Sequence, residues 1–543
     1  MEIQTVKKMQ KEAIKSSGID FIRLGFALFF LVAVLTYSFL STGSIPNNVF
    51  LAIAALFGAY MAMNIGANDV ANNVGPAVGS KALTMSGAII IAAIFEGTGA
   101  FIAGGDVVET IKKGIINIDS FENNIEPFIW AMMAALLATA LWLNLATIMK
   151  APVSTTHSIV GGVMGAGIAA SGFSIVSWDK MGEIAISWVI SPILGGIIAA
   201  VFLFAIIKLI VYRKDKITAA IKWVPIFVAI MSWAFITYLT LKGLNKVWPI
   251  IINFLIFLPN EKEPSFLTAS TFGFIIAITV YFIVKKTVLY KANKLKNTRD
   301  SINLLFTVPL IFAAALLSFA HGTNDVANAI GPLAAINDAV INGGISEKTG
   351  IPIWVMAVGA IGIALGLTLY GPKLIKTVGS EITELDQIRA FCVAMAASIT
   401  VIIASQLGLP VSSTHIAVGG IFGVGFLREY FAATGQEEII AHAQINIEDE
   451  KRVLKAYNSE LEALGNKNKK TKTTYQRIVD LYRVIDEKEE QIKISKKEVK
   501  SVERIEYVKR DAINRIIAAW IITVPAAAIL SAAIFFMIRG IVI

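Results

Sequence analysis

Cysteine and charge are both scarce in this chain. Its 543 residues include one cysteine, Cys392, and only 16% are Asp, Glu, Lys or Arg. A single thiol excludes a disulfide framework and a metal site built from cysteines. Soluble domains carry about 25% charged residues, so the low charge argues against a soluble enzyme. Hydrophobic residues instead make up 56% of the chain, and the mean hydropathy is +0.69.

Apolar runs of about 20 residues recur along most of the sequence, and this is the length that a helix needs to cross a bilayer. The pattern predicts an all-α polytopic membrane protein, because a membrane β-barrel would show short alternating segments. No small-residue cleavage site stands out after the first apolar run. We therefore expect a retained first helix with its N-terminus inside the cell, and a multi-pass protein of the plasma (inner) membrane in contact with membrane lipid.

The net charge of +9 would suggest a nucleic-acid partner in a soluble protein. In a membrane protein, an excess of Lys and Arg marks the cytoplasmic loops. The sequence shows no combination of aromatic and basic residues that would form a platform for bases. We expect no nucleic-acid partner.

Two motifs each occur twice, in the same order and at nearly the same spacing. Residues 66–79 read GANDVANNVGPAVG and residues 322–335 read GTNDVANAIGPLAA. Residues 151–167 read APVSTTHSIVGGVMGAG and residues 409–425 read LPVSSTHIAVGGIFGVG. Such self-similarity indicates one duplicated structural unit.

The duplication divides the chain into six segments. They are a tail with the first transmembrane helix (1–44), transmembrane repeat 1 (45–212), a linker with two apolar helices (213–300), transmembrane repeat 2 (301–433), a charged helical insertion (434–512) and the last helix of repeat 2 (513–543). The Lys- and Glu-rich insertion is predicted to be a cytoplasmic helical hairpin that breaks near Gly465.

Basic clusters at 213–222 and 285–299 flank the two apolar helices of the linker. The positive-inside rule places both clusters in the cytoplasm, so repeat 1 ends inside and repeat 2 begins inside. Repeat 1 follows one helix from a cytoplasmic N-terminus and therefore begins outside. The two repeats have opposite orientations, which is the signature of many secondary transporters whose substrate site lies near the membrane midplane at broken helices.

The first motif places a carboxylate in apolar surroundings in each repeat. A charge at the centre of a membrane helix costs about 2.5–3.5 kcal/mol, so it is expected to have a partner or a function. Gly75-Pro76 and Gly331-Pro332 predict a helix break just after the motif. Freed carbonyls with Asn and Asp oxygens would suit a hard cation such as sodium; proton binding and a purely structural role are the alternatives. The candidate cation ligands are Asn68, Asp69, Asn72, Asn324, Asp325 and Asn328.

The second motif has Pro, hydroxyl residues, His and then small residues. It predicts a short half-helix whose N-terminus points into the protein, where free N–H groups and the helix dipole attract an anion. The hydroxyl groups can donate to oxyanion oxygens without adding charge. The candidate anion ligands are Ser154, Thr155, Thr156, Ser412, Ser413 and Thr414.

Three further residues are candidates for supporting roles. His157 and His415 are predicted to orient the half-helices through side-chain hydrogen bonds, with proton relay or direct anion contact as the alternatives. Glu96 is an intramembrane carboxylate that would be a cation or proton site, or part of a buried ion pair. His321 has Ile65 at its repeat position, so we do not expect it to form a metal pair shared by the repeats.

These motifs together resemble those of the inorganic phosphate transporter (PiT) family. The resemblance covers both repeats, but not the first helix or the details of 213–300 and 434–512. It implies about a dozen transmembrane helices with re-entrant hairpins, a homodimer, no organic cofactor, and symport of inorganic phosphate with sodium or protons. It assigns Asn68, Asp69, Asn324 and Asp325 to the coupling cations and the hydroxyls of the second motif to phosphate.

One position departs from the family pattern. Vertebrate sodium-coupled members carry a glutamate upstream of the second hydroxyl motif, where this chain has Ala394. This leaves sodium and proton coupling both open. Glu96, in contrast, matches a carboxylate that the vertebrate members carry after their first motif.

Three alternatives to a phosphate symporter remain. A sulfate permease would have the same fold and transport mechanism. A carboxylate that faces the anion favours phosphate, because phosphate keeps a proton that it can donate and sulfate at neutral pH does not. An intramembrane hydrolase could use the aspartates or a Ser–His pair, but no third orienting group is evident. A divalent-metal transporter would want more His, Met or carboxylate ligands at the site. We expect a transporter and not an enzyme.

Overall fold

The computed structural model describes residues 3–43, 45–121, 124–149, 153–244, 248–254, 261, 263–343, 350–381, 385–466, 471–502 and 510–543. Helices account for nearly all of the described chain, and the β pairing among the described residues is a single antiparallel bridge between Ile116 and Val176. Eleven described helices are long and apolar enough to cross a membrane. The chain is therefore an all-α, multi-pass integral membrane protein.

The helices before the second repeat follow the chain in this order: α1 (Ile3–Ser41), α2 (Asn48–Gly79), α3 (Met85–Ala103), α4 (Gly105–Glu109), the π-helical turn η1 (Thr110–Gly114), the 3-10 turn η2 (Ile118–Phe121), α5 (Glu126–Ile148), α6 (Thr155–Ser171), the 3-10 turn η3 (Phe173–Ile175), α7 (Trp178–Ile206) with η4 (Ile207–Val211), α8 (Lys216–Tyr238) with η5 (Leu239–Gly243), α9 (Trp248–Phe254) and α10 (Phe266–Ala292). The second repeat and the insertion contain α11 (Arg299–Leu305), α12 (Thr307–Asn342), α13 (Ile353–Glu381), α14 (Gln387–Gln406), α15 (Ser413–Gly465), α16 (Lys472–Val502) and α17 (Arg510–Val542).

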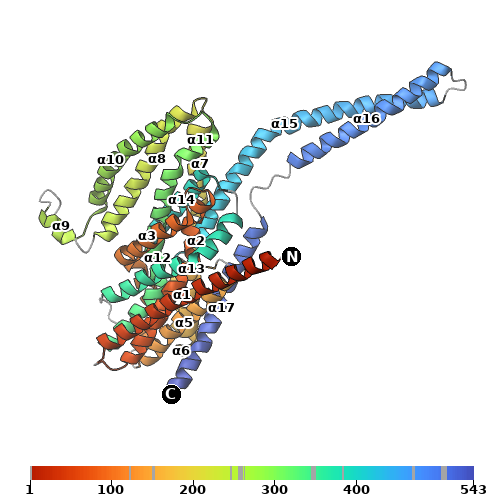
Figure 1. Cartoon of the computed structure of the whole chain (residues 1–543). Helices are drawn as coiled ribbons and strands as arrows, with labels where there is room; N and C mark the ends of the chain where they lie inside the picture. Colours follow the sequence, from red (N-terminus) through yellow and green to blue (C-terminus); the bar gives the residue numbers. More distant parts are fainter. Residues whose placement is uncertain are drawn as a thin grey trace. The chain divides into compact units, whose positions relative to one another are not determined.

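The chain folds as two compact units. The first contains Met1–Val424 and Arg510–Ile543, and the second contains Gly425–Lys509. Figure 1 shows the first unit as a bundle of long helices. The mostly buried membrane helices are α12, α14, α5 and α2, and α2 and α12 carry the duplicated Asn-Asp motifs. In contrast, α1 and α10 are largely exposed and have apolar surfaces suited to lipid.

Glycines let the central helices of the two repeats approach at matching places. A Cβ atom at Gly66 of α2 would overlap the carbonyl of Ile363 in α13, and one at Gly322 of α12 would overlap the carbonyl of Glu96 in α3. The two contacts are equivalent in the duplication. Small residues permit such close backbone contact between membrane helices, so each Asn-Asp motif is fixed against a helix of the other repeat.

The half-helices also pack across the repeats. Gly161 of α6 lies against Val524 of α17, and the equivalent Gly419 of α15 lies against Pro192 of α7. A Cβ at either glycine would collide with a backbone carbonyl. The close packing expected of the small residues in this motif is confirmed.

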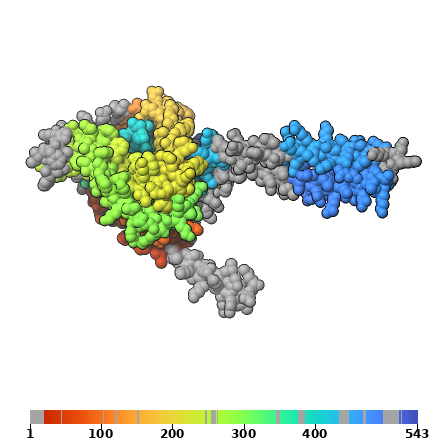
Figure 2. Space-filling view, turned by 90° about the horizontal axis from the view of Figure 1, so that it is seen from above, coloured from red at the N-terminus to blue at the C-terminus, as the bar shows by residue number. Residues whose placement is uncertain are grey.

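The first basic cluster lies at the start of α8 and the second at the end of α10, two helices that pack together. Figure 2 shows the yellow and green parts of the chain side by side. The Asn297 side chain donates to the Lys214 carbonyl at 2.8 Å and accepts from the Lys216 N–H at 2.8 Å. These bonds join the turn before α8 to the turn before α11. Both clusters therefore belong to the same side of the membrane, as the topology argument requires.

The predicted helix breaks at Gly75-Pro76 and Gly331-Pro332 are wrong. Helix α2 continues through Pro76 to Gly79, and α12 continues through Pro332 to Asn342. Membrane helices tolerate proline where neighbouring groups can satisfy the freed backbone. Gly331 serves packing instead, since a Cβ there would lie 2.8 Å from Ile111 Cγ2. The interruptions lie between α5 and α6 and between α14 and α15, at the second motif.

The second unit consists of the part of α15 after Gly425 and of α16, which run antiparallel. Ile447, Leu481 and Ile485 are buried within it. Arg477 makes two hydrogen bonds to the Glu460 carboxylate, at 3.0 and 3.2 Å. The hydrogen bond from Arg477 lowers the pKa of Glu460 below its usual value.

Candidate functional site

The two half-helices begin at the hydroxyl motifs. In α6 the Ser154 hydroxyl accepts the N–H of His157 at 3.1 Å, and in α15 the Ser412 hydroxyl accepts the N–H of His415 at 3.3 Å. Both serines therefore cap their own helix. Their acceptor capacity is used in this way, while each hydroxyl hydrogen remains available to a ligand.

All fifteen predicted site residues are buried in the first unit. Asp325 is the point where hydroxyls of both repeats meet. Its Oδ2 accepts from Thr155 Oγ1 at 3.4 Å and from Ser413 Oγ at 3.1 Å. Thr155 and Ser413 hold equivalent positions in the two motifs, so both half-helix N-termini point at one carboxylate.

Asp69 is engaged by the second half-helix. Thr414 Oγ1 donates to Asp69 Oδ1 at 3.2 Å, and Asn72 Nδ2 donates to Thr414 Oγ1 at 2.8 Å. In the other direction, Asn328 of repeat 2 donates to Thr155 and Thr156 of repeat 1 at 3.3 and 3.2 Å. Each Asn-Asp motif thus binds the half-helix of the opposite repeat.

Asn68 and Asn324 hold the chain just before each half-helix. Asn324 Nδ2 donates to Ser405 Oγ at 3.1 Å and to the Leu409 carbonyl at 3.2 Å. The Asn68 amide lies 3.2 Å from Thr147 Oγ1 and, in its better orientation, 3.2 Å from the Val153 carbonyl and from Asp69 Oδ1. The two asparagines anchor the interruptions between helices.

His321 lies at the centre of this cluster, although the sequence argument set it aside. Its Nε2 is 2.9 Å from Asp325 Oδ2 and 3.6 Å from Asp69 Oδ2, and its Nδ1 is 3.3 Å from Glu96 Oε2. Its side chain is 0% exposed. The available signal was its position four residues before Asp325, which places both residues on one face of α12.

Glu96 has partners in both repeats. Besides His321, it accepts from Asn73 Nδ2 at 2.7 Å. It is therefore joined to the aspartates through one imidazole. The contact between Glu96 and His321 has the geometry of the buried ion pair that was one of the two predictions for Glu96. The other, a cation or proton site, stays a prediction.

One atom each from Asp69, His321 and Asp325 lie within 4.8 Å of one another. Two carboxylates and an imidazole form a donor set that suits a divalent cation. The same carboxylates with the nearby hydroxyl and amide oxygens form a set that suits sodium. The geometry alone admits either ion.

His157 and His415 face each other between the half-helices. Their ring centroids are 4.6 Å apart, and the His157 ring meets the edge of Trp188 at 3.8 Å. Trp188 Nε1 donates to the Pro410 carbonyl at 3.0 Å. The described contacts that position His157 are ring contacts, and its Nδ1 has no hydrogen-bond partner among the described residues. The side-chain hydrogen bonds predicted for His157 and His415 stay predictions.

A second buried charge pair lies away from this cluster. Lys112 Nζ is 2.9 Å from Asp338 Oδ2, and the side chains are 2% and 3% exposed. Close by, Thr110 Oγ1 donates to the Gly408 carbonyl at 2.7 Å. The turn η1 therefore connects the far end of α12 to the loop before the second half-helix.

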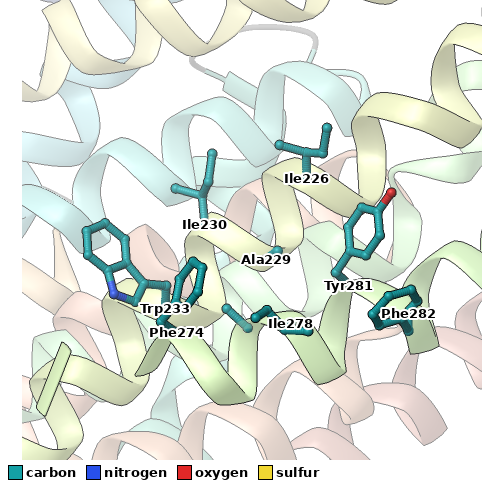
Figure 3. A pocket seen from close by; sticks show the side chains of 9 residues that line it. Ile226, Ala229, Ile230, Trp233, Phe274, Ile278, Tyr281 and Phe282 are labelled. Carbon is teal, nitrogen blue, oxygen red and sulfur yellow. The ribbon is translucent and has the colours of Figure 1, made fainter. Parts of the chain in front are cut away.

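The groove between α8 and α10 has the opposite chemistry. It measures about 360 Å³ and is lined by aliphatic and aromatic side chains, including Ile230, Trp233, Phe274 and Phe282. Figure 3 shows these side chains meeting between the two helices, with the Tyr281 hydroxyl and the Trp233 nitrogen as the only polar groups drawn. An oxyanion would find no charge partner there, so the groove suits lipid chains and not the substrate.

Comparisons with known proteins identify the family of this chain. Residues 65–531 match the model of the phosphate transporter family. A Helicobacter pylori (strain J99) protein named "Putative phosphate permease" is 47% identical over 98% of both chains, and one of the same name from Thermococcus kodakarensis is 38% identical over 70% of this chain and 89% of its own. A solved structure titled "The sodium-dependent phosphate transporter" has a TM-score of 0.70 and 29% identity, covering 91% of this chain and 99% of its own. The chain thus belongs to the phosphate transporter family and is a membrane transporter.

Proposed function

We propose that this chain moves inorganic phosphate by symport with a cation, through alternating access of one central site. The observation that supports this most is the meeting of Thr155 and Ser413, one from each repeat, at Asp325. Two half-helix N-termini offer a site for an oxyanion, and the carboxylates beside them offer a site for cations.

Charge provides the coupling in this proposal. A phosphate dianion placed about 4 Å from an ionised carboxylate is opposed by about 4 kcal/mol per unit charge at an effective dielectric of 20. A cation on Asp69 or Asp325 removes that repulsion. The hydroxyls that now donate to these carboxylates can then rotate to donate to phosphate. Cation and anion therefore bind together more readily than the anion binds alone.

The inverted duplication supports alternating access. Because each Asn-Asp motif binds the half-helix of the opposite repeat, rocking of one repeat against the other moves the walls around a fixed site. The carboxylates Asp69 and Asp325 stay at the interface in both orientations. The same construction would serve sodium or protons.

Uptake of radiolabelled phosphate into proteoliposomes tests the proposal. A sodium gradient and a proton gradient are imposed separately, with excess unlabelled sulfate as a competitor. Sodium is the first ion to test because a solved neighbour is titled a sodium-dependent phosphate transporter. Uptake driven by one gradient and unaffected by sulfate supports a phosphate symporter. No uptake under either gradient, in protein that is folded, would contradict it.

Asp69→Asn and Asp325→Asn test the cation assignment. Each change keeps the shape of the side chain and removes its charge, so we expect coupled uptake to be lost while insertion and thermal stability persist. Asp179→Asn is a suitable control, since this aspartate lies in the first turn of α7 and outside the cluster. Normal gradient-driven uptake in either cluster variant would remove the aspartates from the cation site.

A second candidate function follows from the cluster of Asp69, His321 and Asp325. Its donor set also suits a divalent metal ion, so the cargo could include such a metal. Uptake of radiolabelled manganese or zinc with and without phosphate separates the two cases. Metal uptake that persists without phosphate favours the second function.

A further inference from the structure

A cavity of about 650 Å³ lies among α1, α2, α5 and α13. All four helices cross the membrane region. Three of them contribute polar groups to the lining: Tyr60, Asn64, Asn144, Thr147, Tyr370 and Lys373. Polar side chains within the membrane are expensive unless they face protein or water. The polar part of the lining is therefore suited to hydration, while the remaining lining residues, such as Leu24 and Leu28, are apolar.

The cavity reaches the candidate site through one layer of side chains. Thr147 lines the cavity and lies 3.2 Å from the Asn68 amide, which in turn lies 3.2 Å from Asp69 Oδ1. Asn144 donates to Asn64 at 3.3 Å in the same wall. Asn68 is 1% exposed, so it closes the inner end of the cavity.

The cavity belongs to the side of the membrane where α1 begins. Its outer wall is formed by Leu24, Leu28 and Leu31, in the first half of the membrane-crossing part of α1. Asp20 and Lys373 form an ion pair at 3.5 Å near the same level. Because the basic part of α1 precedes its membrane-crossing part, which begins at Asp20, the positive-inside rule makes this side cytoplasmic.

The duplication offers a direct comparison with the opposite side. In repeat 2, Phe319 holds the position of Met63, Ala320 that of Asn64 and Ser405 that of Thr147. The polar bond between Asn324 and Ser405 matches the contact between Asn68 and Thr147. The corresponding place in repeat 2, here called the second crevice, is therefore lined differently.

Aromatic rings occupy that second crevice. The Phe319 ring lies 5.3 Å from Phe235 and 6.4 Å from Tyr238, and Tyr238 is 2% exposed. Lys242 pairs with Asp106, which holds the position equivalent to Lys373. In both contacts one partner belongs to α8 or η5 (Phe235, Tyr238 and Lys242), and the other belongs to a helix of one of the repeats (Phe319 and Asp106). Repeat 2 is closed by rings at the place where repeat 1 is hollow.

We propose that the cavity lined by Asn64, Asn144 and Thr147 is the chamber through which phosphate passes between the cytoplasm and the central site, and that the ring-filled crevice at Phe319 is its closed counterpart on the other face. The proposal rests on alternating access as proposed above. Lys373 is the cationic group of this chamber, and α1, which has no counterpart within the repeats, separates it from lipid.

The single native cysteine makes this testable by thiol labelling. Cys392 is fully buried, and Cys392→Ala provides a background without thiols. Asn144→Cys places a thiol on the chamber wall. Leu145→Cys is the matched control, because Leu145 is the next residue of α5, is 51% exposed and lies outside the cavity lining, on an apolar surface.

A membrane-impermeant, positively charged methanethiosulfonate is added to either face of sealed vesicles. Only a hydrated thiol forms the reactive thiolate readily, so we expect Asn144→Cys to react about tenfold or more faster than Leu145→Cys, and only from the cytoplasmic face. Phosphate with the coupling cation should slow the reaction, and labelling should block uptake. Tyr60→Cys repeats the test from α2.

Two results would contradict the proposal that the cavity is a cytoplasmic chamber. One is equal labelling of Asn144→Cys and Leu145→Cys, and the other is labelling of Asn144→Cys from the outer face alone. Failure of the proposed function gives a different result. If unmodified protein shows no cation-driven phosphate uptake while Asn144→Cys still reacts from the cytoplasmic face, the chamber stands and the coupling proposal falls.

Discussion

His321 lies between the acidic side chains of the site, where their negative charges would otherwise be close together. Three carboxylates, from Asp69, Glu96 and Asp325, lie within 3.6 Å of its two ring nitrogens. Like charges at this separation would repel each other in a buried site unless a positive charge or a proton lies between them. The imidazole therefore positions Glu96 and Asp325 relative to each other. Ile65, the equivalent residue in repeat 1, is also fully buried but offers no polar atom.

His321→Leu is expected to lower phosphate uptake. Leaving buried carboxylates without their partner costs about 3–5 kcal/mol, and each 1.4 kcal/mol is about tenfold in an equilibrium. We expect a reduction of about tenfold or more, measured as initial uptake rate per folded protein. Ile65→Leu is the matched control and should stay within about twofold, because volume-conserving apolar changes are tolerated well. Unchanged uptake in His321→Leu would show that the imidazole is dispensable.

Residue types predicted most of this site but not its centre. Asp, Asn and hydroxyl residues stand out in apolar sequence because each is costly in a membrane, and duplication singles out the same positions twice. His321 breaks the symmetry, so a comparison of repeats rejects it. The partner of Glu96 is 225 positions away in the other repeat, and no local pattern in the sequence could reveal that contact.

Helix packing decides where the half-helices stand. The adjacent glycines Gly419 and Gly420 of α15 face different surroundings. A Cβ at Gly419 would overlap the Pro192 carbonyl of α7, whereas the nearest neighbour of a Cβ at Gly420 is Val393 Cγ1 at an ordinary 3.4 Å. The backbone of Pro192 cannot yield as a flexible side chain could. Comparing substitutions at these two glycines therefore distinguishes the effect of close backbone packing from the general effect of replacing a glycine in a helix.

Gly419→Ala is expected to destabilise the protein, and Gly420→Ala is not. Forcing a methyl group into a packed contact costs about 1–3 kcal/mol. Alanine in an uncrowded helix position is favourable by about 0.5–1 kcal/mol over glycine. Thermal unfolding in detergent measures both, and uptake should fall only for Gly419→Ala. Similar melting temperatures for the two variants would mean that the approach of α7 and α15 is not tight.

The course of the helices was predictable in part. The hydroxyl motifs predicted helix starts at the places where α6 and α15 begin, because Ser before a small-residue run is a capping signal. The proline rule failed for α2 and α12. The rule counts the hydrogen bond that proline removes, whereas α2 and α12 are mostly buried among other helices and continue through their prolines. Gly331 is explained by its contact with Ile111, which a sequence cannot show.

The whole molecule is built so that each repeat completes the other. The half-helix α6 packs on α17, and the start of α15 packs on α7. The site is therefore an interface between repeats, which is the arrangement that the proposed alternating access requires. The duplicated motifs and the opposite orientations predicted for the repeats already indicated that the site lies between the two repeats. The sequence does not show which crevice is hollow, because that depends on how Phe319 and Tyr238 pack.

The charged unit of α15 and α16 is expected to be dispensable for the transport step. It has its own apolar contacts, with Ile447, Leu481 and Ile485 buried inside it, and independent units tolerate removal at exposed linkers. Replacing residues 440–508 by a short flexible linker should leave phosphate uptake within about threefold of the full chain, since none of the predicted site residues lies in the deleted segment. Proteoliposome uptake with an imposed cation gradient measures this.

Leu481→Asp is the companion variant for that deletion. It keeps the full length but places a charge in the apolar contact between α15 and α16, which should open the hairpin because an unpaired buried charge is strongly unfavourable. If transport needs neither the hairpin nor its folding, both variants retain uptake. Loss of uptake in the deletion alone would mean that the segment contributes by its presence. Loss in both, with the membrane helices still folded, would mean that the paired helices take part in the transport cycle.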